Sequence, residues 1–240
     1  MKKIKWLIMA LFMSMVFPMA AQAQDFGLDI SAGIKKEFLA MFYAKAVANV
    51  RTNDNTTDME RFAIRAGLGF ELVVVRLELG YTFLYYNFRN PFSGYGDEEK
   101  HFGLPSHRFY ANLAGMLPLG NFKLSLRAGY QFTHFGEKEI GGTRGPDTEV
   151  KVGGNNAHIF RTRIKAQYTI GESGFTPYAA LEFYDDLKDK FDLDTLRVTG
   201  GVVFNFLDFN NIELYYRYVA AMDKGAEDMH YIGLKYLADF

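Results

Sequence analysis

The sequence predicts an all-β protein: a transmembrane up-and-down antiparallel β-barrel of about 10–12 strands that follows a cleaved N-terminal signal peptide. Three observations lead to this prediction. Residues 1–23 have the three-part layout of a secretory signal. The remaining chain repeats segments of about ten to thirteen residues in which apolar and polar side chains alternate. Aromatic residues lie at both ends of the apolar faces, as expected for strands that cross two membrane interfaces.

The signal peptide is predicted to end at Ala23. Three lysines within the first five residues precede the apolar run Trp6–Met19, and Ala21-Gln22-Ala23 forms a small-residue cleavage site before Gln24. A membrane anchor is the alternative, but the run is shorter than the roughly 20 residues that a spanning helix needs. Residues 24–240 are then expected to form a single barrel domain, since one all-β barrel commonly reaches about 250 residues.

Period-two alternation is the main evidence for strands. In residues 62–71, Phe62, Ile64 and Leu68 lie on one face, and Arg65 and Glu71 lie on the other. The same division recurs in residues 122–135, 158–170, 196–206 and 212–219. Soluble barrels alternate as well, with large apolar residues inside, so an outward apolar face is inferred from the signal, the chain terminus and the aromatic residues. Two aromatic girdles are predicted: Phe62, Tyr81, Phe83, Tyr85, Phe109, Tyr130, Phe132, Phe183, Tyr216 and Tyr218 near one rim, and Phe70, Phe122, Phe204, Phe206 and Tyr236 near the other.

The composition excludes several kinds of site. The chain has no cysteine, which excludes a disulfide, a thiolate metal site and a lipid-modified N-terminal cysteine. Its 27 basic and 28 acidic residues are balanced, so no nucleic-acid partner is expected. After Ala23 no apolar stretch reaches the about 18 residues of a spanning helix. We expect no cofactor and no metal.

Connections of two lengths alternate along the chain. The short ones, predicted to be periplasmic turns, are residues 34–39, 72–74, 118–121, 171–174 and 208–211. The long polar ones, predicted to be extracellular loops, are residues 52–60, 90–105, 136–156, 186–194 and 222–228. Eleven strands result, although single-chain bacterial barrels normally have an even number. Three alternatives stay open: Phe26–Lys35 is an unusual closing strand, it leaves the wall of a ten-stranded barrel, or Gly136–Asn156 contains another strand.

The polar face is rich in charge and is predicted to line the lumen. Fixed charges in a narrow barrel are costly unless counter-charges, hydrogen bonds or water match them. The favoured interpretation is an ion-pair network that plugs the lumen, and the alternative is a basic constriction that selects anions. The predicted network consists of Arg65, Arg76, Glu78, Arg127, Arg161, Arg163, Glu182, Arg197, Glu213 and Arg217.

Four histidines lie at strand ends on the predicted extracellular side, namely His107, His134, His158 and His230. Histidine can act as a proton-transfer base or bind metal, so His107 and His230 are the candidate catalytic residues of an alternative outer-membrane hydrolase or protease. No histidine has a serine two residues later, and Ser106, beside His107, belongs to the opposite face. The favoured interpretation is therefore an interfacial polar residue that caps a strand.

Several short motifs resemble a known family. They are Asp25-Phe26-Gly27, residues 51–55 (RTNDN), residues 107–110 (HRFY), residues 161–163 (RTR), residues 176–178 (TPY), residues 213–218 (ELYYRY) and residues 230–234 (HYIGL). The mature chain resembles an uncharacterised outer-membrane β-barrel family of Bacteroidota, known only as a domain of unknown function. The last strand, which ends on Phe240, is similar to the C-terminal signal through which barrels meet their assembly machinery. This resemblance implies a fold and no established activity.

The function predicted from these features is an outer-membrane barrel of a Gram-negative bacterium that is structural or weakly pore-forming, with a charge-plugged lumen. Its expected partners are outer-membrane lipids and the barrel assembly machinery, while soluble partners stay unknown. An adhesin that docks through residues 136–156 is a further possibility.

Overall fold

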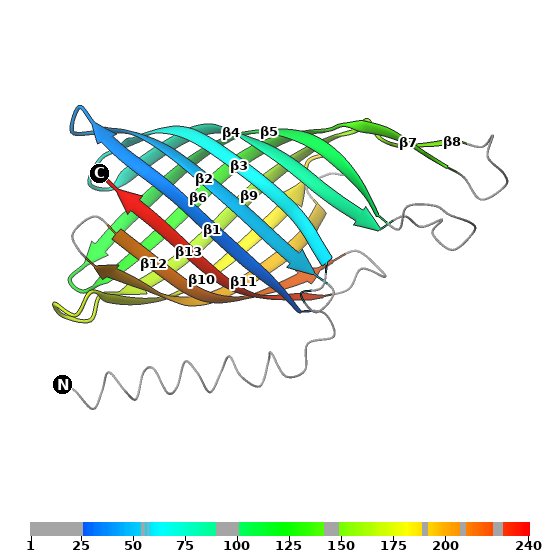
Figure 1. Ribbon diagram of the computed structural model, residues 1–240. Helices are drawn as coiled ribbons and strands as arrows, with labels where there is room; N and C mark the ends of the chain where they lie inside the picture. Colours follow the sequence, from blue (N-terminus) through cyan, green and yellow to red (C-terminus); the bar gives the residue numbers. More distant parts are fainter. Residues whose placement is uncertain are drawn as a thin grey trace.

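Eleven strands form a closed barrel, and two short strands form a separate hairpin (Figure 1). The computed structural model describes residues 26–53, 56, 58–89, 101–141, 149–188, 192–206, 210–222 and 228–240. No helix among them is long and apolar enough to cross a membrane. The strands of the barrel are β1 (Phe26–Phe38), β2 (Phe42–Asn53), β3 (Asp58–Glu71), β4 (Val75–Arg89), β5 (His101–Leu119), β6 (Phe122–Phe135), β9 (Asn156–Tyr168), β10 (Phe175–Asp186), β11 (Asp192–Phe206), β12 (Asn210–Ala221) and β13 (Met229–Asp239).

The predicted all-β barrel is confirmed, and its strand count is odd. Consecutive strands pair antiparallel around the wall, while β1 pairs parallel with β13, from Phe26 opposite His230 to Lys35 opposite Asp239. Of the three alternatives, β1 is therefore the closing strand. Residues 136–156 do contain strands, β7 (Glu137–Gly141) and β8 (Glu149–Gly153), but these pair only with each other. The predicted signal peptide lies outside the described residues.

Two strands extend further than their sequence patterns predict. Strand β1 runs to Phe38, so the first turn is not at residues 34–39 but at residues 39–41. Lys36 interrupts the apolar face of Ile34 and Phe38 there, yet pairing with β2 and with the end of the chain keeps the segment extended. Strand β5 begins within the predicted loop at residues 90–105, because pairing with β4 continues past Pro105 to His101.

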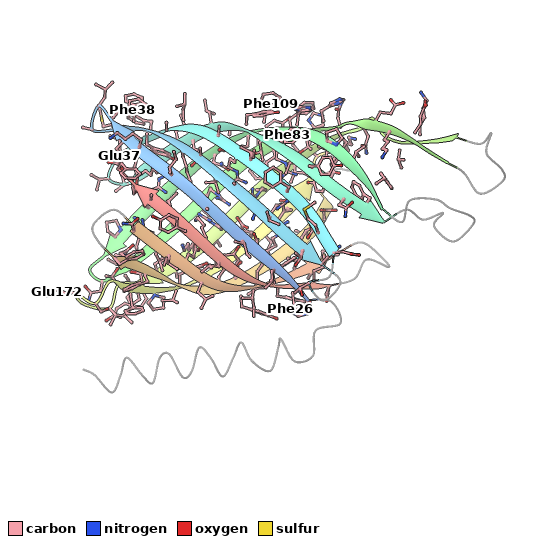
Figure 2. All side chains as sticks on the ribbon, in the orientation of Figure 1. Phe26, Glu37, Phe38, Phe83, Phe109 and Glu172 are labelled. Carbon is pink, nitrogen blue, oxygen red and sulfur yellow. The ribbon has the colours of Figure 1, made fainter. Side chains whose placement is uncertain are left out.

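The apolar face of the wall points outward. Large apolar side chains such as Leu68, Leu113 and Leu126 are exposed on the outer surface, whereas Thr133 and Tyr231 on the opposite face are buried. Figure 2 shows Phe38 and Phe109 projecting outward from the wall. Aromatic contacts on this face occur near both rims, among them Phe42 with Phe70 at one rim and Tyr81 with Phe109 at the other.

The two ends of the barrel differ. We call the end with the short connections the turn end and the opposite one the loop end. Strand β1 starts at the loop end, β13 finishes at the turn end, and the β7–β8 hairpin projects beyond the loop end (Figure 1). Because β1 and β13 run in the same direction, the two ends of the barrel-forming chain lie at opposite ends of the barrel.

We call the parallel pairing of β1 with β13 the parallel seam. A buried carboxylate links the strands on both sides of this seam. Asp29 on β1 is only 3% exposed. It accepts hydrogen bonds from Arg51 of β2 at 3.2 Å and from Arg217 of β12 at 2.7 Å. Asn49 Nδ2 donates a third bond to it at 2.5 Å. Since β12, β13, β1 and β2 are consecutive in the wall, this one side chain holds four strands around the closure.

Asp29→Asn is expected to destabilise the closed barrel by about 3–5 kcal/mol, because it removes the carboxylate that Arg217 contacts and leaves Arg51 with only Glu60 at 3.7 Å. Urea unfolding of the barrel in detergent micelles, followed by far-ultraviolet circular dichroism, measures the change. Glu139→Gln is the control: Glu139 pairs with exposed Lys151 in the β7–β8 hairpin, so its loss should cost at most about 1 kcal/mol. Equal unfolding midpoints for Asp29→Asn and the wild type would show that Asp29 does not hold the seam.

Candidate functional site

The lumen contains all ten residues of the predicted charge network. Each belongs to the face opposite the exposed apolar side chains. The structure does not join them into one network. Arg127 and Arg161 pair with Glu182, Arg217 pairs with Asp29, Arg76 pairs with Glu71, and Glu213 pairs with Lys235. The charges thus form separate groups along the wall.

A recurring arrangement of four residues lines the lumen, and we call it a tyrosine unit. A tyrosine ring lies against a glycine directly opposite on the neighbouring strand, a cation lies over the ring, and the hydroxyl is close to a carboxylate. In the units of Tyr43, Tyr110 and Tyr231 the hydroxyl donates a hydrogen bond to that carboxylate. The described residues include five units: Tyr43, Gly69, Lys35 and Glu78; Tyr110, Gly80, Arg65 and Glu78; Tyr178, Gly201, Lys165 and Glu213; Tyr215, Gly233, Arg217 and Asp29; and Tyr231, Gly27, Arg51 and Glu60.

Each part of the unit has a physical role. Glycine leaves a gap in the inner surface, which the cross-strand ring fills. In the unit of Tyr43, a Cβ on Gly69 would overlap the ring. The Tyr43 hydroxyl donates to Glu78 at 2.9 Å, and the Lys35 amine lies 5.1 Å from the ring centroid, within cation–π range. The tyrosine unit therefore fills part of the lumen and supplies a hydrogen bond to a carboxylate. It also holds a cation on the inner side of the wall, away from the apolar outer face.

A denser group of charges surrounds Glu182, and we call it the Glu182 cluster. It consists of Glu182 and Tyr184 on β10 with Arg127 from β6, Arg161 and Arg163 from β9 and Arg197 from β11. Arg127 and Arg161 both donate to Glu182 Oε1, the latter at 2.9 Å. Arg197 donates to the Tyr184 hydroxyl at 2.6 Å, and that hydroxyl donates to Glu182 Oε2 at 3.3 Å. Glu182 thus contacts two of the four guanidinium groups directly and a third through the Tyr184 hydroxyl.

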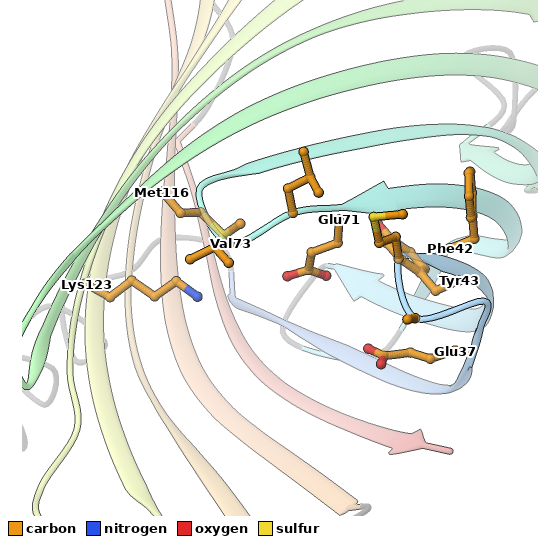
Figure 3. Close-up of a pocket in the computed structure, with 10 residues that line it drawn as sticks. Glu37, Phe42, Tyr43, Glu71, Val73, Met116 and Lys123 are labelled. Atoms are coloured by element: carbon orange, nitrogen blue, oxygen red, sulfur yellow. The ribbon is translucent and has the colours of Figure 1, made fainter.

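The lumen is packed at the loop end and more open at the turn end. Toward the loop end, the inward side chains of Leu84, Ser106 and Thr133 are at most 1% exposed. Toward the turn end, the side chains of Arg76 and Lys235 are 40% and 32% exposed. A cavity of about 260 Å³ opens there, lined by polar residues such as Glu71 and Lys123 and by apolar turn residues such as Val73 (Figure 3).

The histidines lie on the outer face near the loop end, each beside a polar side chain. His107 Nδ1 lies 2.6 Å from the Tyr81 hydroxyl, and His158 Nδ1 lies 2.7 Å from that of Tyr130. His134 contacts Asn156 and His230 contacts Tyr216.

The structure does not bring the candidate catalytic histidines together. His107 is on β5 and His230 is on β13, with β1, β2, β3 and β4 between them on the shorter path around the wall. Ser106 is buried on the inner face, opposite to His107. Among the described residues, no group of three or more histidine or acidic side chains is placed to hold a metal ion.

Sequence reasoning missed the tyrosines as organising residues of the lumen. Tyr215 was assigned to the polar face with Glu213 and Arg217, which is where the structure places it, but it was given no role. Arg51, which pairs with Asp29 and Glu60, was also left out of the predicted lumen charges. The available signal was an aromatic residue on an otherwise polar face. Its glycine partner becomes visible only when the register between the two strands is known.

The family of the chain is identified by its sequence. A family model described as "Protein of unknown function (DUF2490)" matches residues 30–230. The chain belongs to this family. No curated protein sequence matches this DUF2490 chain.

Three solved barrel structures align with this DUF2490 protein. The translocator domain of the autotransporter NalP from Neisseria meningitidis aligns with a TM-score of 0.53 at 12% identity, over 77% of this chain and 70% of that one. The β domain of the Bordetella autotransporter BrkA aligns with a TM-score of 0.48 at 16% identity, covering 81% and 79%. The NanC porin aligns with a TM-score of 0.47 at 11% identity, covering 86% and 93%. The NalP alignment supports a similar barrel architecture.

Gly69→Ala is expected to destabilise the barrel by about 1–3 kcal/mol, because the added methyl group must displace the Tyr43 ring from a packed position. The cost should fall in a Tyr43→Ser background, which a double-mutant cycle of urea unfolding would show. Gly115→Ala is the control, since a Cβ there meets nothing within 4 Å. An equal cost in the two backgrounds would exclude the ring as the cause.

Proposed function

We propose that this protein is an outer-membrane β-barrel of a Gram-negative bacterium whose lumen is closed rather than an open channel. The continuous apolar outer face supports a membrane location, because large exposed apolar surfaces are unfavourable in water. Aromatic contacts near both rims, as expected at membrane interfaces, support it further. The similarity of the wall to the NalP translocator domain agrees with it. An origin in Bacteroidota stays a prediction.

The proposal also orients the barrel. Bacterial barrels have short periplasmic turns and longer extracellular loops. The turn end then faces the periplasm, and the loop end with the β7–β8 hairpin faces outside. The cavity next to Lys123 opens toward the periplasm in this orientation.

The observation that carries the closed lumen is the burial of inward side chains toward the loop end. Ser106 has no exposed surface and Leu84 only 1%. A water-filled channel would leave inward side chains accessible along its whole length. Ion pairs and tyrosine units occupy that space instead, which supports a structural role or at most a weak leak. His107 and His230 lie on the outer face and on strands that are not neighbours. Their positions therefore do not support the alternative of an outer-membrane enzyme.

The purified protein is expected to produce no steady conductance steps in planar bilayers, because the packed loop end leaves no continuous water path. A variant that combines Arg161→Ala and Tyr184→Ala should conduct, since both side chains occupy the lumen. Its current should favour anions, because the remaining lumen side chains near Glu182 are mainly basic.

Lys235→Ala, at the open turn end, is the matched control and should stay silent in the same bilayers. Steady steps from the wild-type protein would contradict a closed lumen.

We also propose that Phe240 acts in assembly, as its resemblance to the terminal barrel signal implies. The Phe240 ring is exposed, while its backbone N–H donates to Lys35 at 2.8 Å and its carbonyl accepts from Glu37 at 2.9 Å. Phe240→Ser keeps both backbone bonds, so it is expected to reduce the folded protein recovered from outer membranes while refolding in detergent stays normal. Heat-modifiable migration on gels measures both. Unchanged recovery from membranes would refute the assembly role.

A further inference from the structure

The Glu182 cluster has an imbalance of charge that its own side chains do not correct. Arg127 and Arg161 share one carboxylate, and no carboxylate of the described residues lies within 4 Å of Arg163 or Arg197. Elsewhere in the lumen some arginines are paired: Arg51 contacts both Asp29 and Glu60. Others, such as Arg61 and Arg108 beside Tyr86, have no carboxylate within 4 Å among the described residues. The cluster therefore concentrates positive charge on the wall formed by β6, β9, β10 and β11.

Unused hydrogen-bond donors accompany the excess charge. The Nε atoms of Arg127, Arg161, Arg163 and Arg197 are all buried and have no hydrogen-bond partner in the part of the chain that the structure describes, as is also true of the Nε atoms of Arg51, Arg61 and Arg76. Guanidinium groups present donors in a planar fork that matches oxyanions. A buried donor left without an acceptor costs free energy, and a buried charge without a counter-charge costs more. An anion with several acceptor oxygens would supply both the missing hydrogen-bond acceptors and the missing negative charge.

We propose that the Glu182 cluster is a binding site for a small inorganic oxyanion of the phosphate or sulfate class. The anion lies among the four guanidinium groups on the inner side of the wall, where it offsets the excess charge that Glu182 leaves. A lipid headgroup is the wrong source, because these side chains are on the face away from the apolar outer surface. Solvent reaches the cluster, since the side chain of Arg127 keeps 18% of its surface exposed. The site is independent of conductance, because a closed barrel can still hold an ion.

Isothermal titration of the purified barrel in dodecyl maltoside micelles tests the site, with sodium phosphate or sodium sulfate added over a constant sodium chloride background. Saturable binding of one anion per barrel is expected. Arg163→Gln should weaken it about tenfold or more, which corresponds to the loss of one charge-assisted contact. Arg163 suits this test because the structure gives it no ion pair to break, and circular dichroism checks that the variant folds.

Arg76→Gln is the matched control. It removes one lumen arginine at the turn end, away from Glu182, and should leave the affinity unchanged. Glu182→Gln should bind phosphate more tightly than the wild type, because it removes the competing carboxylate. The proposal is overturned if the wild type shows no saturable binding of either anion, or if Arg163→Gln and Arg76→Gln weaken binding equally.

Discussion

A closed barrel with an odd number of strands must contain a parallel pair when all other neighbours are antiparallel, and this constraint shapes the whole structure. The parallel pair joins β1 to β13 and therefore the two ends of the barrel-forming chain. Parallel pairing is slightly weaker per residue than antiparallel pairing, and contacts between distant segments carry the largest loop-closure entropy. Asp29 offsets both costs because it binds arginines on the strands that flank the seam.

The same carboxylate connects closure to the filling of the lumen. Asp29 accepts a hydrogen bond from Tyr215, whose ring covers Gly233 on β13. Closing the wall therefore completes a tyrosine unit at the seam. The units explain how a lumen with many charges can be packed: rings take up volume, hydroxyl groups satisfy carboxylates, and cations lie over the ring faces. A polar interior can then exclude water without leaving most of its charges unpaired.

Local pattern was enough to predict the wall but not the contacts across it. Alternation with period two is a property of each strand alone, so the inward position of Arg65 or Glu182 could be predicted from its neighbours in sequence. The partner of each residue depends on register and closure. Arg217 and Asp29 are 188 residues apart, and Arg127 and Glu182 are 55 apart. No local signal indicates such pairs.

The parallel pairing of β1 with β13 could not be predicted from local sequence pattern either. Counting strands backward from Phe240 reached eleven, but sequence alone left three ways to reconcile that number with an even barrel. Only the observed register, with Phe26 opposite His230, decides between them. The end of β1 was predicted too early for a related reason: Lys36 interrupts its apolar face, while the pairing that extends the strand comes from β2 and from residue 240.

Tyr184 shows why the Glu182 cluster differs from the rest of the lumen. In each tyrosine unit, a ring rests against one glycine and carries one cation, and its hydroxyl meets a carboxylate. Tyr184 lies instead between two cations, with Arg161 and Arg197 at 4.7 and 4.1 Å from its ring centroid, and residue 195 opposite it is threonine. Its hydroxyl donates a hydrogen bond to Glu182 and accepts one from Arg197. Arg197 is therefore connected to the Glu182 carboxylate only through this hydroxyl. A neutral hydroxyl cannot supply the charge that is missing, so the positive excess persists where Tyr184 departs from the repeating arrangement.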